Sequence, residues 1–194
     1  DQEKSVLFFE KAFEAARTSG DPQGVFMSWS GAVEALIHRF DNMKPLDRWI
    51  AVFDGLMKDY GTFPSKEVEV RSTLFMFLAL SFRAPAHPDM GLWAEKTLSL
   101  LNNIPDPDAY AQAGLCLVDY FVWTGDLEKA NVIVERLTNM AERQDHSPFA
   151  RITIKLSEAL NYLYRGRLEE CVGTVSEGLR ISETKGMNIF DYFL

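Results

Sequence analysis

One eight-residue pattern occurs twice in this chain, at Trp123–Ala130 and, 41 residues later, at Tyr164–Cys171. Both copies read aromatic-x-Gly-x-Leu-Glu-x-small. Gly125 and Gly166 can adopt the left-handed backbone conformation that ends a helix, and the small residue five positions later lets the next helix approach closely. Such a pattern at a period of roughly 20–50 residues is typical of stacked helix–turn–helix units. The chain is therefore predicted to contain a helical repeat.

Proline and glycine residues divide the rest of the sequence into helices. All eight prolines lie between stretches of helical apolar spacing, and several follow a residue that can cap a helix. These caps are Asp21-Pro22, Asp106-Pro107 and Ser147-Pro148. Ten helical segments are predicted, at residues 3–19, 23–40, 45–60, 65–83, 88–103, 107–124, 126–143, 148–165, 167–185 and a truncated one from 188. No stretch alternates apolar and polar residues as a strand would, so the chain is predicted to be all-α.

Pairing alternate helices gives an α-α superhelix of about five helix pairs, expected to form a single domain over residues 1–194. Four residues take the same place early in the second helix of successive pairs: Trp49, Trp93, Ala130 and Cys171. The last two are small, as a close helix approach requires. The tryptophans depart from the pattern, so helix packing over residues 23–103 is expected to differ from packing in the later pairs.

The run Phe8–Gly24 and the Gly125–Ala130 segment resemble the helix ends of tetratricopeptide-like (TPR) repeats in large bacterial transcription regulators of the MalT-like type. The likeness at residue level covers positions 8–24, 120–130 and 159–171. It implies a helical solenoid whose concave face senses a ligand or partner. In that family a nucleotide-binding domain and a DNA-binding domain flank the solenoid.

The charge of the chain excludes one class of partner. Its 20 basic and 28 acidic residues give a net charge of −8, which repels a phosphate backbone, so this segment is not expected to contact nucleic acid directly. No window offers the roughly 18 apolar residues of a membrane span. Cys116 and Cys171 lie in apolar helical stretches and are predicted to be buried small hydrophobes, which favours a reducing cytoplasm. The first residue and the aromatic last seven suggest a piece of a longer chain.

No pattern in the sequence predicts catalysis or a cofactor. The chain has no Gly-x-Ser-x-Gly elbow and no glycine-rich phosphate loop. His87 and His146 fall in predicted loops, and His38 shares a helix face with Glu34 without a third ligand at a suitable spacing. The chain is therefore predicted to be non-catalytic, with no metal and no cofactor.

The binding surface is predicted from the repeat register, because the first helices of such pairs line the concave face. Gly125 and Gly166 fix that register for two units, Trp49 extends it to a third, and residues 65–83 are assigned by their aromatic residues. The candidate binding residues are Glu34, His38, Phe75, Phe82, Gln112, Asp119, Trp123, Thr153, Leu160 and Tyr164. This mixture of aromatic and polar side chains suits a protein or peptide segment, or a small-molecule effector with an apolar body.

Three functions remain open on the sequence. The first is a ligand- or partner-sensing solenoid in a bacterial transcription regulator or signalling protein, joined to flanking domains. The second is a general TPR scaffold for protein–protein interaction with no role in transcription. The third is self-association through the apolar last segment.

Overall fold

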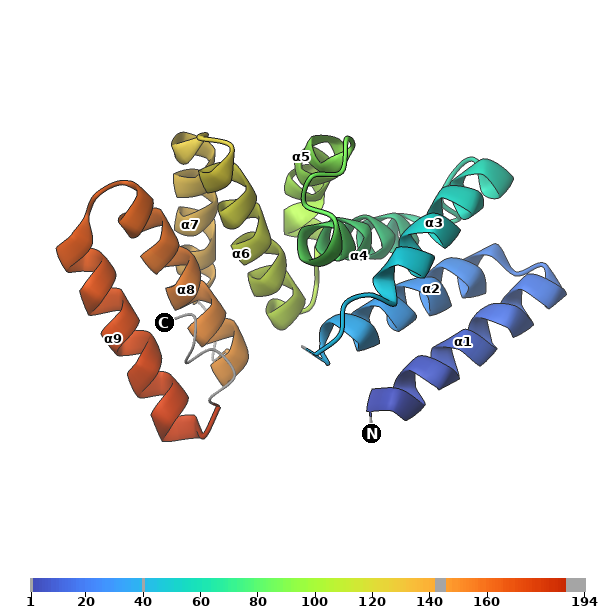
Figure 1. The fold of residues 1–194 in the computed structure, drawn as a ribbon, viewed down its shortest axis with the longest axis horizontal. Helices are drawn as coiled ribbons and strands as arrows, with labels where there is room; N and C mark the ends of the chain where they lie inside the picture. Colours follow the sequence, from blue (N-terminus) through green and yellow to red (C-terminus); the bar gives the residue numbers. More distant parts are fainter. Residues whose placement is uncertain (1, 40, 142–145, 188–194) are drawn as a thin grey trace. The chain divides into compact units, whose positions relative to one another are not determined.

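The structure, a computed structural model, describes residues 2–39, 41–141 and 146–187 (Figure 1). These residues form helices and turns and contain no strand, so the all-α prediction is confirmed. The elements are α1 (Gln2–Ser19), α2 (Pro22–Ile37), α3 (Leu46–Tyr60), α4 (Lys66–Arg83), α5 (Met90–Leu100), the short 3-10 helix η1 (Leu101–Asn103), α6 (Pro107–Trp123), α7 (Leu127–Ala141), α8 (Pro148–Tyr164) and α9 (Leu168–Lys185). None of these helices combines the length and the apolar character that a membrane span needs.

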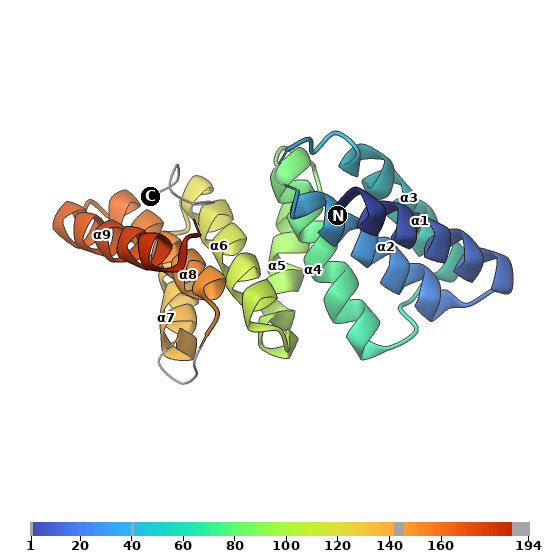
Figure 2. The same cartoon turned by 90° about the horizontal axis from the view of Figure 1, so that it is seen from below.

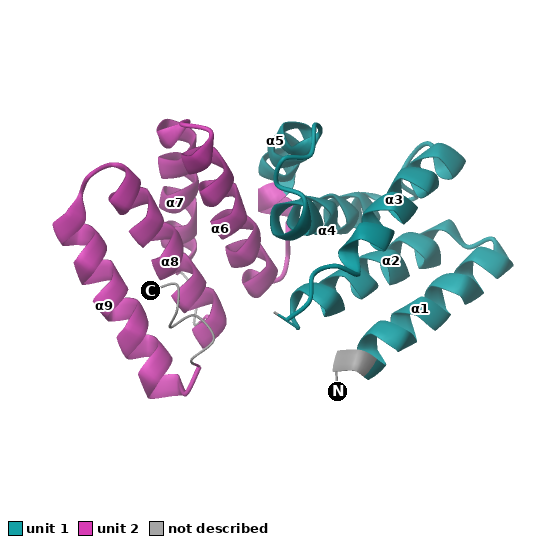
Figure 3. Cartoon of the chain, viewed as in Figure 1, with its two compact units in different colours: residues 1–100 teal, residues 101–194 magenta. Residues whose placement is uncertain are grey.

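The chain divides into two compact units (Figure 3). Unit 1 is Asp1–Leu100 and contains α1 to α5, and unit 2 is Leu101–Leu194 and contains η1 and α6 to α9. In each unit helices pack against their neighbours in sequence, and the first helices of successive pairs also pack together, α2 with α4 and α6 with α8. This arrangement is consistent with a helical superhelix. That residues 1–194 form a single domain stays a prediction.

The glycine turns that define the sequence repeat have the predicted conformation. Gly125 has φ 83° and Gly166 has φ 71°, in the left-handed region. After each glycine a backbone N–H reaches back to the last turn of the helix, at 2.8 Å from Asp126 to Phe121 and at 2.9 Å from Arg167 to Tyr162. These bonds satisfy carbonyls that a helix end leaves unpaired. The repeated glycines therefore end α6 and α8.

Two of the three predicted capping residues accept a capping hydrogen bond. The Ser147 hydroxyl accepts from Ala150 N at 3.0 Å, and the Asp106 carboxylate accepts from Asp108 N at 3.3 Å. Asp126 likewise accepts from Lys129 N at 3.1 Å at the start of α7. Asp21 is the exception, because it occupies the N-cap position of α2 without accepting a capping hydrogen bond. There Pro22, which has no N–H to satisfy, begins the helix.

Aromatic side chains fill the interior of unit 1. Trp29 and Phe53 lie with ring centroids 4.5 Å apart, and Phe53 also contacts Phe26 at 6.2 Å. Trp49 is buried against Phe13, and its carbonyl accepts a 2.8 Å hydrogen bond from the Trp29 indole. Because these side chains come from α1, α2 and α3, the rings hold the three helices together.

Aliphatic and small residues form most of the interior of unit 2, and Phe121 is a buried ring among them. Ile152 and Leu156 of α8 pack on Ile181 of α9, and the two helices run side by side in two perpendicular views (Figures 1 and 2). Ala130 of α7 is fully buried, as the repeat pattern predicts. A Cβ atom on Gly114 would lie only 2.6 Å from Leu137, so α6 and α7 approach closely at that glycine.

Some predictions fall outside the described residues. The truncated helix from 188 and the aromatic end of the chain lie there, as do positions 142 and 143 of the segment predicted at 126–143. The segment predicted at 88–103 is divided into α5 and the 3-10 helix η1.

Candidate functional site

The candidate site in unit 2 is an exposed aromatic pair at the ends of α6 and α8. Trp123 is 74% exposed and Tyr164 is 44% exposed. Their ring centroids lie 6.5 Å apart with the planes inclined at 53°. The Trp123 indole N–H donates a 3.0 Å hydrogen bond to Asp119 Oδ1. A large apolar surface in this unit is thus exposed to solvent and held in one orientation by two contacts.

The repeat itself places these rings together. Trp123 is the last residue of α6 and Tyr164 is the last residue of α8, each two positions before a turn glycine. Because α6 and α8 pack side by side, equivalent positions on the two helices are neighbours. Asp119 lies one helical turn before Trp123, on the same helix face, where its carboxylate can reach the indole. The sequence pattern therefore determines both the pair and its polar partner.

Burial of polar groups on α6 changes their ionisation. The Asp119 residue is exposed as a whole, but protein atoms around its carboxyl group exclude water and raise its pKa. The hydrogen bond from Trp123 acts in the opposite direction and is the smaller effect. Cys116 lies one turn earlier, and desolvation, with a further contribution from the Asp119 charge, raises the pKa of its thiol to about 12. The exposed Trp123 indole therefore lies next to the Asp119 carboxyl group and the Cys116 thiol, from which protein atoms exclude water. We call these two groups the desolvated layer.

A second group of candidate residues meets in unit 1, between α2 and α4. The Arg71 guanidinium pairs with the Glu34 carboxylate, donates to Ser30 Oγ at 3.1 Å and stacks on the Phe75 ring at 4.9 Å. Glu34 and Phe75 were predicted from the sequence. Arg71, which joins them, was not, because the register of residues 65–83 was not anchored by a turn glycine. The signal in the sequence that could have identified Arg71 is its spacing, one helical turn before the aromatic Phe75.

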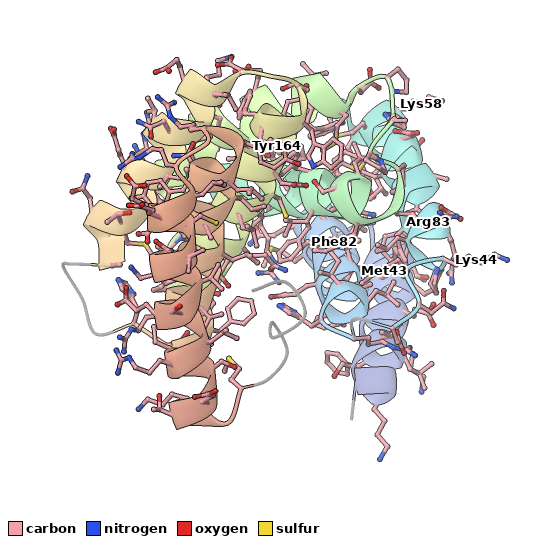
Figure 4. The ribbon with its side chains drawn as sticks, turned by 60° about the vertical axis from the view of Figure 1, so that its left-hand side comes forward. Met43, Lys44, Lys58, Phe82, Arg83 and Tyr164 are labelled. Atoms are coloured by element: carbon pink, nitrogen blue, oxygen red, sulfur yellow. The ribbon has the colours of Figure 1, made fainter. Side chains whose placement is uncertain are left out.

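The remaining candidates occupy different environments. Phe75, Gln112 and Thr153 are buried between helices, so they contribute to packing rather than to the accessible surface. Leu160 is half-buried on α8, and His38 is half-buried at the C-terminal end of α2. Figure 4 labels Phe82 near the end of α4, where it is 36% exposed, and Tyr164 at the end of α8. The ten candidates thus include one exposed pair, one ion-pair group, the separately exposed Phe82, and several buried or half-buried residues.

Side chains able to hold a metal do not converge in the described part of the chain. No three His, Cys, Asp or Glu side chains among those residues are arranged for metal coordination. Both cysteines are free thiols and half-buried as whole residues, although protein atoms exclude water from the Cys116 thiol. His146 is buried, and its Nε2 lies 2.9 Å from the carbonyl of Met140. This contact joins His146, in the segment before α8, to the last turn of α7.

Comparison with known proteins gives no match: no family model, no curated protein and no solved structure is similar to this chain. The resemblance of Phe8–Gly24 and Gly125–Ala130 to TPR-like regulators is thus a resemblance of sequence pattern. The packing of α6 with α8 and the positive φ of the turn glycines are what the structure adds to it.

Proposed function

We propose that this chain is a non-catalytic helical-repeat module that binds a protein or peptide segment through the exposed aromatic pair of unit 2. The observation that carries the proposal is Trp123, which is mostly exposed although its indole N–H donates to Asp119 and its ring lies next to that of Tyr164. A side chain held in place loses little conformational entropy when a partner covers it. Tryptophan and tyrosine are also the residues most enriched at the energetic centres of interfaces.

The chemistry around the pair defines the segment that it would bind. An apolar or aromatic side chain of the partner would cover Trp123 and Tyr164. Asp119 Oδ1 accepts from the indole, whereas Oδ2 accepts no hydrogen bond from the described residues, so it offers an acceptor to an N–H group or a cation. A short segment with an apolar residue near a lysine, an arginine or a free backbone N–H fits this arrangement.

The test is selection of peptides from a random library displayed on phage, with the chain immobilised. Selected peptides are then measured against the wild-type chain and against Trp123→Ala. We expect Trp123→Ala to weaken binding at least about tenfold, since loss of a central interface tryptophan costs about 2 kcal/mol or more. Leu92→Ala is the matched control, because Leu92 is also an exposed apolar residue but belongs to unit 1. Peptides that bind both variants like the wild type would contradict the proposal.

The resemblance stated for Phe8–Gly24 supports a narrower role within this proposal. The module would be the sensing solenoid of a bacterial cytoplasmic transcription regulator, and its occupant would be a protein segment or a small-molecule effector. The alternative is a general scaffold that only recruits a partner. Introducing Trp123→Ala into the intact parent protein and measuring reporter transcription separates the two. A changed output with unchanged protein level supports regulation, and an unchanged output supports the scaffold.

A further inference from the structure

A surface depression of about 460 Å³ lies in unit 1, at the turn between α3 and α4. Its walls come from the end of α3, the turn, the first turn of α4, and α5. The residues that matter for its chemistry are Met57, Phe63, Ser65, Lys66, Glu69 and Lys96. A volume of this size is within the range of small-molecule sites, roughly 300–1,000 Å³. The exposed aromatic pair belongs to unit 2, so the depression is a separate feature.

The depression carries one cation that no carboxylate neutralises. Lys66 forms an ion pair with Glu69, with 2.9 Å between Nζ and Oε2. Lys96 forms no ion pair within the described part of the chain, and its ammonium lies 4.8 Å from the centroid of Phe63 and 5.3 Å from that of Trp93. Two lysines against one glutamate leave the lining with a charge of +1, whereas the whole chain carries −8. The local positive charge therefore stands out in an acidic protein.

Two rings attract the Lys96 ammonium and fix its position. A cation over an aromatic face is attracted by the electron density of the ring, and the N–H bonds that point away from the rings stay available to an acceptor. Lys96 is half-buried, so its ammonium is less fully hydrated than that of an exposed lysine. The arrangement holds N–H donors of Lys96 at the wall of the depression, and no carboxylate of the described residues forms an ion pair with them.

A second donor and an apolar wall accompany Lys96. The Ser65 hydroxyl oxygen accepts a 3.3 Å hydrogen bond from Val68 N, which leaves its own hydrogen for another acceptor. Phe63, whose ring lies beneath the Lys96 ammonium, and Met57 supply apolar surface in the same lining. Phe63 in turn contacts Phe26 at 5.4 Å and Phe53 at 6.3 Å, so the wall is continuous with the aromatic interior of unit 1.

We propose that this depression binds a small organic anion. Its carboxylate or phosphate group pairs with Lys96 and accepts from Ser65, and its apolar body lies against Phe63 and Met57. The Lys96 ammonium favours a negatively charged ligand over a neutral or positively charged one. The apolar wall favours an organic anion over inorganic phosphate. Because Phe63 joins the wall to the interior, an occupant also stabilises unit 1 against unfolding.

The test follows the methyl signals of the chain labelled with [methyl-¹³C]methionine during titration with phenyl phosphate, inorganic phosphate and benzylamine. Met57→Leu identifies the Met57 signal, and Met76, which is buried in α4, is the internal reference. We expect phenyl phosphate to shift the Met57 signal saturably, with a Kd of about 1 mM or tighter. Inorganic phosphate should bind at least about fivefold more weakly because it lacks an apolar body. Benzylamine, an aromatic cation, should give no saturable shift.

A pair of lysine variants tests the role of charge. Lys96→Met keeps the apolar stem and removes the cation, so phenyl phosphate binding should weaken at least about fivefold. Lys58→Met removes a charge from an exposed residue of α3 that is not among the lining residues, and binding should not change (Figure 4). Equal binding by Lys96→Met and the wild type, or saturable binding of benzylamine, would overturn the proposal. Trp123→Ala leaves this titration unchanged, so the two sites are tested independently.

Discussion

The two units differ in where their tryptophan side chains lie. In unit 1, Trp29 and Trp49 are buried among the helices together with Phe53. In unit 2, the rings of Trp123 and Tyr164 are exposed, and the interior is mainly aliphatic with Phe121 as a buried ring. The two units share the helix-pair plan, with first helices packed side by side in each. The same plan therefore supports two different uses of aromatic residues.

The residue early in each second helix explains this difference. In unit 2 that position is Ala130 in α7, a side chain small enough for the helices to pack closely on aliphatic residues. In unit 1 it is Trp49 in α3, whose ring contacts Phe13 of α1. A large residue there needs further rings to fill the space around it, because protein interiors are close-packed. A small residue at this position leaves aromatic side chains free for the surface.

The largest expected effect comes from replacing the same residue type in the two environments. Trp49→Ala removes a ring that is 2% exposed, and it should lower the free energy of unfolding by about 3–5 kcal/mol. Trp123→Ala removes an exposed ring and should change that free energy by about 0.5 kcal/mol or less. Urea unfolding followed by circular dichroism measures both. Equal losses for the two variants would break the comparison between the units.

Two glycines of unit 2 test how closely its helices pack. Gly114→Ala places a methyl group 2.6 Å from the buried side chain of Leu137, and such overpacking costs about 1–3 kcal/mol. Gly173→Ala in α9 meets no atom within 4 Å, so the better helix propensity of alanine should stabilise by about 0.5–1 kcal/mol. The free energies of unfolding should therefore differ by about 1.5–4 kcal/mol. A stabilising Gly114→Ala would show that α6 and α7 have room between them.

Much of the fold follows from local signals in the sequence. Gly125 and Gly166 end their helices because the left-handed conformation costs glycine little, and that property is visible without any tertiary information. The proline and capping residues mark helix starts for the same reason. Asp21 shows the limit of such signals, since it has the right position and residue type but accepts no capping bond. A side-chain rotamer depends on neighbours that the sequence does not reveal.

The candidate site was predictable only where a glycine fixed the register. Trp123 and Asp119 precede Gly125 at known distances, and their shared face follows from helical spacing. Phe75 lies on α4, which ends at Arg83 without a glycine, and its ring is buried beside an arginine that the pattern did not identify. Pairing of Arg71 with Glu34 depends on how α2 and α4 pack, which is tertiary information.

The Cys116 thiol tests the desolvated layer next to the exposed indole. A rise in its pKa from 9.0 to about 12 lowers the thiolate fraction about a thousandfold. The greater nucleophilicity of a more basic thiolate restores about thirtyfold, so disulfide exchange should be about thirtyfold slower than in the unfolded chain. Reaction with Ellman's reagent at pH 8, on Cys171→Ser with and without guanidinium, measures this ratio. Asp119→Asn should have a smaller effect. It should make Cys116 react faster with Ellman's reagent, because the variant removes a negative charge that raises the thiol pKa.

The pH dependence of that reaction shows whether the pKa of the Cys116 thiol is raised or lowered. The thiolate fraction of the folded chain should keep rising from pH 9 to about pH 12, whereas that of the unfolded chain levels off above about pH 10. Over the same range the unfolded chain releases its thiol proton first, so the free energy of unfolding should fall as the pH rises. A folded-state reaction rate that levels off near pH 10 would show that the thiol is hydrated and that no desolvated layer exists.

The smallest expected effects concern the ion pairs that join helices in each unit. Arg165 of unit 2 lies 3.2 Å from Glu128, but Glu128 is 84% exposed, so solvent screens the pair and its coupling energy should be about 0.5 kcal/mol or less. Arg71 and Glu34 of unit 1 are each about two-thirds covered, and their coupling should approach about 1 kcal/mol. Double-mutant cycles with Arg71→Met, Glu34→Gln, Arg165→Met and Glu128→Gln measure both.

Because salt screens exposed charges more strongly than covered ones, 1 M NaCl should abolish the unit 2 coupling and leave part of the unit 1 coupling. If the two ion pairs have equal coupling energies that respond equally to salt, the aromatic packing of unit 1 does not shield its polar contacts. The difference between the units is then confined to the placement of their aromatic rings.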